Sequence, residues 1–200
     1  VTQIDKTDHG WQVTASGETY DCTQLVNAAG AWVDQIAEMA GITPIGIQPL
    51  RRSMARLPAP GGHDVSSWPM LIGAGECWYA KPDAGKLIVS PADAELTTPH
   101  DAYTDDMVLA EGLARYEEMV TEPVTRVESN WAGLRSFAPD KALVLGPDPD
   151  QPTFIWSAAQ AGYGFQTAPA ASRLVADLVG GCASELEPEI IAQLSPARLR

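Results

Sequence analysis

The stretch Ala158-Ala159-Gln160-Ala161-Gly162-Tyr163-Gly164-Phe165-Gln166-Thr167-Ala168-Pro169 joins an apolar strand to a helix with an apolar stripe. Its glycines let the backbone approach a ligand closely, and the N-terminus of the helix favours an electron-rich group. The pattern imitates a dinucleotide-binding G-x-G-x-x-G loop, but Thr167 stands where the third glycine would allow tight packing. Residues 180–200 offer no second strand of a βαβ unit. The stretch therefore predicts a cofactor-contacting loop near the end of a larger fold, and a structural turn is the alternative.

The composition indicates a folded, acidic chain. Hydrophobic residues make up 45% of the 200 residues, and the formal net charge of −13 argues against nucleic acid or an anionic membrane as a partner. The three cysteines are widely spaced and show no ligand spacing with histidine. Neither a disulfide framework nor a metal site is predicted, and a reducing, cytoplasmic setting is expected. No apolar run reaches membrane-spanning length.

Apolar patterning and turn formers predict a mixture of strands and helices. The first strands are expected at residues 1–4, 11–15 and 19–26. The Pro- and Gly-rich region 42–100 predicts an antiparallel sheet with strands at 53–57, 69–72, 76–80 and 86–90. One helix is expected from Trp32 to Gly41, a second capped by Thr104, and a third that begins near Thr167 and ends before Gly180.

Two further stretches are candidates for ligand contact. Leu25-Val26-Asn27-Ala28-Ala29-Gly30-Ala31-Trp32 places small residues between a strand and a helix, and a tight turn is its structural alternative. Trp131-Ala132-Gly133-Leu134-Arg135-Ser136-Phe137-Ala138-Pro139-Asp140 presents Arg135 on extended chain. A strand arginine that pairs with a surface acid is the alternative for this second stretch.

The three stretches, in this order and spacing, resemble the FAD-dependent D-amino acid oxidase/dehydrogenase (DAO) family. Three more segments resemble those of D-arginine dehydrogenase-type members: Gln48-Pro49-Leu50-Arg51-Arg52-Ser53, Trp68-Pro69-Met70-Leu71 and Tyr79-Ala80-Lys81-Pro82-Asp83. The resemblance implies an α+β or α/β fold, the C-terminal half of a two-domain FAD-binding oxidoreductase with a mostly antiparallel substrate-domain sheet. Residues 1–46 and 131–200 are then expected in the FAD-binding domain and residues 47–130 in the substrate-binding domain.

The resemblance also implies roles for individual residues. Arg52 and Arg135 would bind the substrate carboxylate, Tyr79 would donate a hydrogen bond to it or cover the substrate, and the Gly162 carbonyl would accept from the substrate amine. The residues expected to contact FAD, bound without a covalent link, are Ala28, Ala29, Gly30, Trp32, Gly162, Tyr163, Gly164, Phe165, Gln166 and Thr167. Arg51 is expected on the opposite face of its strand from Arg52, as a solvent or ion-pair residue. No residue is assigned as an acid or base catalyst, and a packed sheet aromatic is the alternative for Tyr79.

Physical chemistry agrees with these roles. A planar guanidinium can bind both oxygens of a carboxylate in fixed geometry, which aligns the substrate Cα–H for hydride transfer. The expected reaction is FAD-dependent oxidation of a D-amino acid, basic ones among the candidates, to an imino acid that hydrolyses to a keto acid and ammonia. A glycine- or sarcosine-type oxidase is a second interpretation. A truncated, flavin-free binding or scaffold domain is a third.

The family's N-terminal strand, G-x-G-x-x-G loop and helix, which hold the ADP half of FAD, have no counterpart in this sequence. We therefore expect the N-terminal half of the same fold as a partner, besides the small-molecule substrate. Whether residues 1–200 bind FAD by themselves is left open by the sequence, as are the electron acceptor and the oligomeric state.

Overall fold

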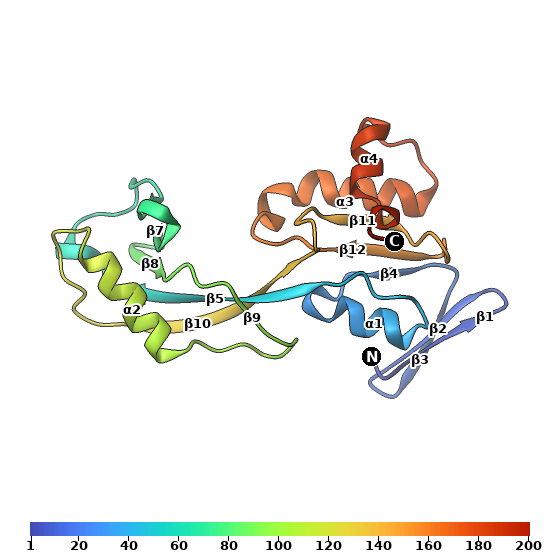
Figure 1. Cartoon of the computed structure of the whole chain (residues 1–200), viewed down its shortest axis with the longest axis horizontal. Coiled ribbons are helices and arrows are strands. Elements are labelled where there is room, and N and C mark those ends of the chain that lie inside the picture. The colour runs from blue at the N-terminus through green and yellow to red at the C-terminus, as the bar shows by residue number, and fades with distance from the viewer. The chain divides into compact units, whose positions relative to one another are not determined.

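The computed structural model describes residues 1–200, which form two compact units. Unit 1 consists of Val1–Pro49 and Arg135–Arg200, and unit 2 of Leu50–Leu134. Both boundaries fall inside strands, β5 (Gln48–Leu57) and β10 (Ser129–Phe137) (Figure 1). Helices and mostly antiparallel sheets confirm the predicted fold class, whereas what each unit binds stays a prediction.

Unit 1 contains two small sheets. The first is an antiparallel meander of β1 (Gln3–Thr7), β2 (Gly10–Ala15) and β3 (Glu18–Cys22). The second has the order β11-β12-β4, in which β11 (Val144–Pro147) runs antiparallel to β12 (Phe154–Ala158) and β4 (Leu25–Asn27) runs parallel to it. The parallel pair aligns Trp156 with Asn27, so both strands end at the same edge.

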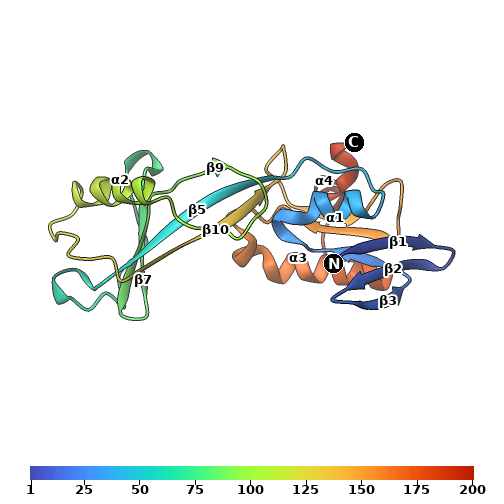
Figure 2. The ribbon, with the colours of Figure 1, turned by 90° about the horizontal axis from the view of Figure 1, so that it is seen from below.

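Helices cover both faces of the second sheet of unit 1. The views in Figures 1 and 2 place α1 (Val33–Met39) on one side of it and α3 (Gly164–Gly180) on the other. The short 3₁₀ helix η1 (Gly30–Trp32) precedes α1, and α4 (Pro188–Leu194) and η4 (Pro196–Leu199) follow α3. The core of this unit joins the meander, α1 and the second sheet through the buried side chains of Ile4, Trp11, Val33, Ala37, Phe154 and Trp156.

Unit 2 is a sheet with one helix on one of its faces. Its strand order is β10-β5-β8-β7-β6, with β9 (Glu95–Leu96) paired to the start of β5. The remaining strands are β6 (Leu71–Ile72), β7 (Tyr79–Asp83) and β8 (Lys86–Ser90), and short 3₁₀ helices lie at η2 (Pro60–Gly62) and η3 (Ala74–Glu76). The core of the unit comprises Ala55, Leu57, Trp78, Ala80, Leu87, Val89, Leu109 and Tyr116.

Helix α2 (Asp106–Glu117) begins later than the sequence predicted. Its N-cap is Asp105, whose carboxylate accepts the amides of Met107 and Val108, both at 3.0 Å. Thr104 instead donates its hydroxyl to the Asn130 side chain at 3.0 Å. An aspartate side chain at the cap satisfies two N–H groups of the first turn, so the helix starts one residue after the predicted cap would allow.

The alternation of β5 sorts its side chains onto two faces. Ser53, Ala55 and Leu57 are buried on the face that α2 covers. Leu50, Arg52, Met54 and Arg56 are half-buried on the opposite face. Since α2 is the single α-helix of unit 2, no α-helix of the unit covers the Arg52 face. In the whole chain, none of the helices combines the length and the apolar character needed to cross a bilayer.

Candidate functional site

The turn that follows β4 is held by a buried asparagine. Asn27 is 2% exposed, and its side-chain amide donates to the Val33 carbonyl at 2.8 Å while its oxygen accepts the Ala29 amide at 3.3 Å. These two bonds fold Ala28, Ala29 and Gly30 into a tight turn, in which Gly30 adopts a φ of 59° that favours glycine. The tight turn named as the structural alternative is thus present, at the place where a ligand contact is predicted.

The loop of residues 159–163 follows β12 at the same edge of the sheet. Within it, Ala159 and Ala161 have φ values of 61° and 50°, unusual for residues with a side chain. The Ala161 amide donates to the Ser136 carbonyl at 3.0 Å, and the Tyr163 hydroxyl donates to the Lys141 carbonyl at 3.0 Å. These contacts, one to β10 and one to the chain after it, fix a backbone that the loop would not adopt by itself.

Helix α3 begins at Gly164, three residues earlier than predicted. Its N-cap, Tyr163, makes no side-chain capping bond, and the first turn holds no acidic residue. Thr167, expected to open the helix, instead lies one turn in and donates its hydroxyl to the Tyr163 carbonyl at 2.8 Å. The first-turn N–H groups therefore have no side-chain acceptor of their own, and the Phe165 side chain beside them is fully exposed.

Arg135 and Gly162 meet within unit 1. Arg135 lies on β10 and is half-buried. A Cβ built on Gly162 would stand 3.1 Å from the guanidinium Nη1 and 3.5 Å from Cζ. The guanidinium thus lies close to the place that a side chain at position 162 would occupy. The structure brings together the two residues that the sequence paired through the substrate, one for its carboxylate and one for its amine.

Arg52 and Tyr79 meet within unit 2. The Arg52 guanidinium carbon lies 5.9 Å from the centre of the Tyr79 ring, and the Tyr79 hydroxyl donates to the Met54 sulfur at 3.5 Å. Arg51 points the other way and forms ion pairs with Glu95 and Asp93, which confirms the ion-pair role predicted for it. Adjacent arginines therefore serve different partners because successive strand residues face opposite sides.

The residues predicted to contact FAD fit an electron-rich cofactor. Ala28–Gly30 and Gly162–Thr167 follow two neighbouring parallel strands, and ligands in such sheets bind beyond the carboxyl ends of the strands. Small side chains in the first segment leave the backbone open, and no Cβ contact within 4 Å would limit Gly30. The second segment offers the uncapped N-terminus of α3, which suits a group that carries negative charge.

Other side chains that shape the site escaped sequence reasoning. Asn27 was quoted within a motif but given no role, although a buried amide before a small-residue turn is a recognisable signal. Ser53, Ser90 and Asp93, which bind one another beside Arg52, carried no signal because 37–40 residues separate the partners.

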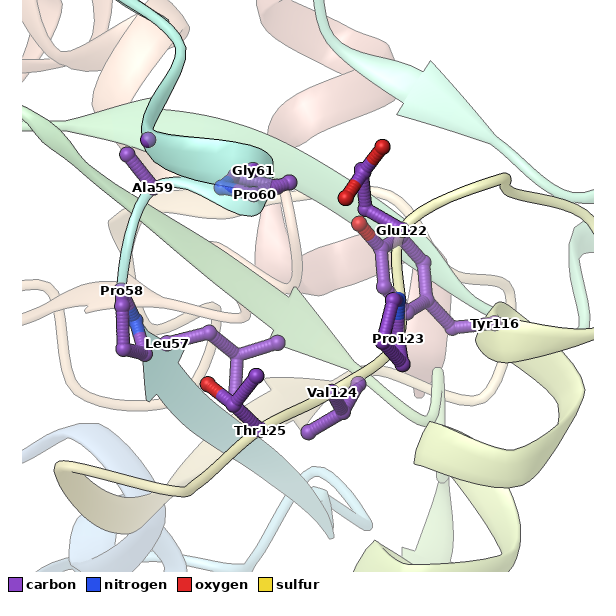
Figure 3. A pocket seen from close by; sticks show the side chains of 11 residues that line it. Leu57, Pro58, Ala59, Pro60, Gly61, Tyr116, Glu122, Pro123, Val124 and Thr125 are labelled. Atoms are coloured by element: carbon purple, nitrogen blue, oxygen red, sulfur yellow. The ribbon is translucent and has the colours of Figure 1, made fainter.

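A cavity in unit 2 does not coincide with these residues (Figure 3). It has a volume of about 210 Å³ and is lined by the loops around Pro58–Gly62 and Glu122–Thr125, with Tyr116 at its wall. Glu122 is its one charged lining residue. None of the predicted substrate or cofactor residues lines it, so it gives no support to their roles.

Comparison with known proteins places the chain among flavoenzymes. Residues 1–178 match the family model for FAD dependent oxidoreductase (DAO). FAD-dependent oxidoreductase domain-containing protein 1 of Bos taurus is 28% identical over 190 residues, covering 87% of this chain and 38% of that protein. Glycerol 3-phosphate dehydrogenase of Caloramator mitchellensis is 28% identical over 197 residues, covering 94% of this chain and 40% of that protein. The chain thus spans about two fifths of these curated relatives.

Solved structures share the fold. Glycine oxidase from Geobacillus kaustophilus superposes with a TM-score of 0.78 at 21% identity, over 99% of this chain and 51% of that one. L-proline dehydrogenase from P. horikoshii gives 0.79 at 22% identity, over 99% of this chain and 53% of that one. At these identities the likeness confirms the fold, and the chemistry rests on the residues described above.

Proposed function

The chain belongs to the family of FAD-dependent oxidoreductases, and we propose that the protein containing it oxidises an amino acid at the Cα–N bond, a D-amino acid in the first instance. The observation that carries the proposal is the closeness of Arg135 and Gly162 within unit 1, where a Cβ built on Gly162 would stand 3.1 Å from the guanidinium Nη1. Two neighbouring residues then offer a bidentate cation for a carboxylate and a carbonyl acceptor for an amine, and an α-amino acid carries both a carboxylate and an amine.

The chain's own residues bind and orient. The Arg135 guanidinium binds the substrate carboxylate, and the Gly162 carbonyl accepts a hydrogen bond from the amine. Within unit 2, the Arg52 guanidinium lies over the Tyr79 ring, and this pair offers a cation and a phenol for an anionic substrate group. No side chain is needed as a base if the amine binds in its neutral form.

FAD, when bound, supplies the acceptor for the hydride that leaves Cα. The turn Ala28–Gly30 and the N-terminal turn of α3 are the segments that would hold it. The α3 N–H groups and the positive end of the helix dipole stabilise negative charge on a group next to them. Trp32 and Phe165, 41% and 100% exposed, would cover apolar parts of the cofactor or substrate.

The test is a substrate panel with the intact, FAD-loaded protein. D-amino acids with basic, apolar and acidic side chains, their L-enantiomers, glycine, sarcosine and glycerol 3-phosphate are each mixed with the protein anaerobically. Bleaching of the flavin absorbance by D-amino acids would support the proposal. Reaction with glycine and sarcosine alone would instead support a glycine- or sarcosine-type oxidase. Reaction with glycerol 3-phosphate alone would refute an amino acid substrate.

Replacing Arg135 tests the residue that carries the proposal. Arg135→Ala is expected to lower kcat/KM at least about 30-fold, because loss of one partner of a desolvated charge pair costs roughly 2–5 kcal/mol. Arg126→Ala removes an exposed arginine that pairs with Glu128 at 3.0 Å and serves as the control. Equal kcat/KM values in the two variants would show that Arg135 does not bind the substrate.

A further inference from the structure

The pairing of strand β5 with β9 and β8 is interrupted next to Arg52. Its pairing with β9 ends at Arg51↔Glu95, and its pairing with β8 begins at Ala55↔Val89. Three residues of β5, 52–54, therefore face five residues, 90–94, on the other side of the ladder. The longer side bulges outward and holds Ala92 at a φ of 56°. Such a bulge leaves backbone groups of β5 without ladder partners.

Side chains replace the missing ladder bonds at Ser53. The Asp93 carboxylate accepts the Ser53 amide through Oδ1 and the Ser53 hydroxyl through Oδ2, both at 2.7 Å. The Ser90 hydroxyl donates to the Ser53 carbonyl at 2.7 Å and accepts the Ala92 amide at 3.1 Å. Both backbone groups of Ser53 are thus held, in a place where Ser53 and Ser90 are fully buried and the Asp93 side chain is 7% exposed.

This arrangement acts directly on the peptide bond that joins Arg52 to Ser53. The amide held by Asp93 belongs to that peptide bond, so its plane, and with it the direction in which Arg52 leaves the strand, is fixed. The Arg51 Nε lies 3.8 Å from the same carboxylate, which gives the buried charge a cation as well. On the other face, Arg52 lies over the Tyr79 ring.

We propose that Asp93, with Ser90, is a positioning residue that fixes Arg52 for binding the substrate carboxylate. The inference rests on the proposed function for the role of Arg52. A carboxylate is suited to the task because it accepts two hydrogen bonds at once and has no donor to satisfy. Asp93 acts on Arg52 through the backbone, because its carboxylate accepts the Ser53 amide, which belongs to the peptide bond between Arg52 and Ser53.

The experiment is a double-mutant cycle in the intact, FAD-loaded protein. Two quantities are measured, KM for the substrate and the Kd of 2-aminoisobutyrate by calorimetry, since this amino acid has no hydrogen on Cα to transfer. Asp93→Ala is expected to raise both about tenfold, the effect of one lost hydrogen bond to a charged group. Asp93→Asn keeps an acceptor and is expected to raise both by less.

The cycle separates positioning from folding. In an Arg52→Ala background, Asp93→Ala is expected to change neither quantity by more than about twofold, because the side chain it positions is gone. The control is Asp83→Ala, which removes a carboxylate that pairs with another β5 arginine, Arg56, at 3.2 Å. This control should leave KM and Kd within about twofold. If Asp93→Ala yields too little folded protein, Asp93→Asn takes its place in the cycle.

Two kinds of result would overturn the inference, and they differ. If Arg52→Ala leaves KM and Kd unchanged, the substrate role of Arg52 fails and the positioning role of Asp93 fails with it. If Arg52→Ala raises both but Asp93→Asn and Asp93→Ala change neither, the proposed function stands and the inference is wrong. An Asp93 effect of equal size in both backgrounds would show a structural role and also refute positioning.

Discussion

Gly162 matters at the scale of single atoms. A methyl group on it would stand 3.1 Å from Nη1 of Arg135, closer than most carbon–nitrogen contacts, so the guanidinium must move by a few tenths of an ångström. Gly162→Ala is therefore expected to lower kcat/KM about tenfold or more, because small displacements of a binding group are costly in catalysis. The melting temperature should change little, because the half-buried arginine can shift. Steady-state kinetics and thermal unfolding of the intact protein measure the two effects.

Gly133→Ala is the matched control for that change. Gly133 lies two residues before Arg135 on the same strand, and a Cβ there would meet nothing within 4 Å. Its replacement should leave kcat/KM near the wild-type value. If the two alanine variants behave alike, contact with the guanidinium is not what Gly162 provides.

At the scale of residues, the sequence named pairs of substrate residues whose members lie near each other in the structure, while their roles in substrate binding stay predictions. Arg135 with Gly162 and Arg52 with Tyr79 were named as substrate residues from motifs, and the structure places the members of each pair in contact range. The bond between Ser53 and Asp93 could not be predicted, because the partners are 40 residues apart and meet through an irregular bulge. No periodicity in the sequence marks such a bulge.

At the scale of elements, α2 depends on a close approach to the strand that ends at the bulge. A Cβ on Gly112 would stand 2.2 Å from the Pro91 Cβ and 2.6 Å from its Cα, where a rigid ring cannot yield. Gly112→Ala is expected to lower the free energy of unfolding by about 1–3 kcal/mol through overpacking. Chemical denaturation of the intact protein, followed by circular dichroism, measures it.

The sign of the change in the free energy of unfolding distinguishes overpacking from helix propensity at position 112. Alanine favours a helix over glycine by about 1 kcal/mol, so propensity alone predicts stabilisation. Ala110→Gly, at an exposed position of the same helix, measures the propensity term by itself. A Gly112→Ala variant more stable than wild type would mean that α2 does not pack on Pro91 as described.

Helix starts show where sequence rules for elements reach their limit. The rule that a helix begins at a polar cap placed α3 at Thr167 and α2 after Thr104, and both helices start elsewhere. For α2 a neighbouring aspartate is the better acceptor. For α3 no side chain caps the first turn, which is where a bound group would complete the hydrogen bonds. The error for α3 thus falls on the candidate site itself.

At the scale of the whole molecule, order and spacing of motifs predicted the family and the fold class, while long-range ties remained hidden. One such tie joins Asp140, which follows β10, to Arg198 in η4, 58 residues later. Its carboxylate binds Arg198 Nε at 2.6 Å and Nη2 at 3.2 Å. Arg198 also donates to the carbonyls of Ala142 and Ser195, so it closes the C-terminal segment onto the chain after β10.

This tie predicts a pH dependence of stability. The hydrogen bond from Arg198 is the main cause that lowers the pKa of Asp140, so the carboxylate stabilises the fold at pH values above its usual pKa of about 4. That contribution is lost as the pH falls through the lowered pKa, when the group becomes protonated in the folded protein as well. Asp140→Asn is therefore expected to melt at a lower temperature than wild type at pH 7, with a gap that closes on acidification.

The size and partner of the effect can be checked together. Because the Asp140 side chain is 40% exposed, the gap at pH 7 should correspond to less than about 1 kcal/mol and shrink with added salt. Arg198→Gln removes the other partner of the ion pair. The difference in melting temperature between this variant and wild type should also close as the pH falls through the same range. Adding it to Asp140→Asn should cost less than the two single changes summed, because they remove one shared interaction. A gap that stays constant from pH 7 to pH 3 would show that the ion pair does not hold the C-terminal segment, and that its packing on β11 alone does so.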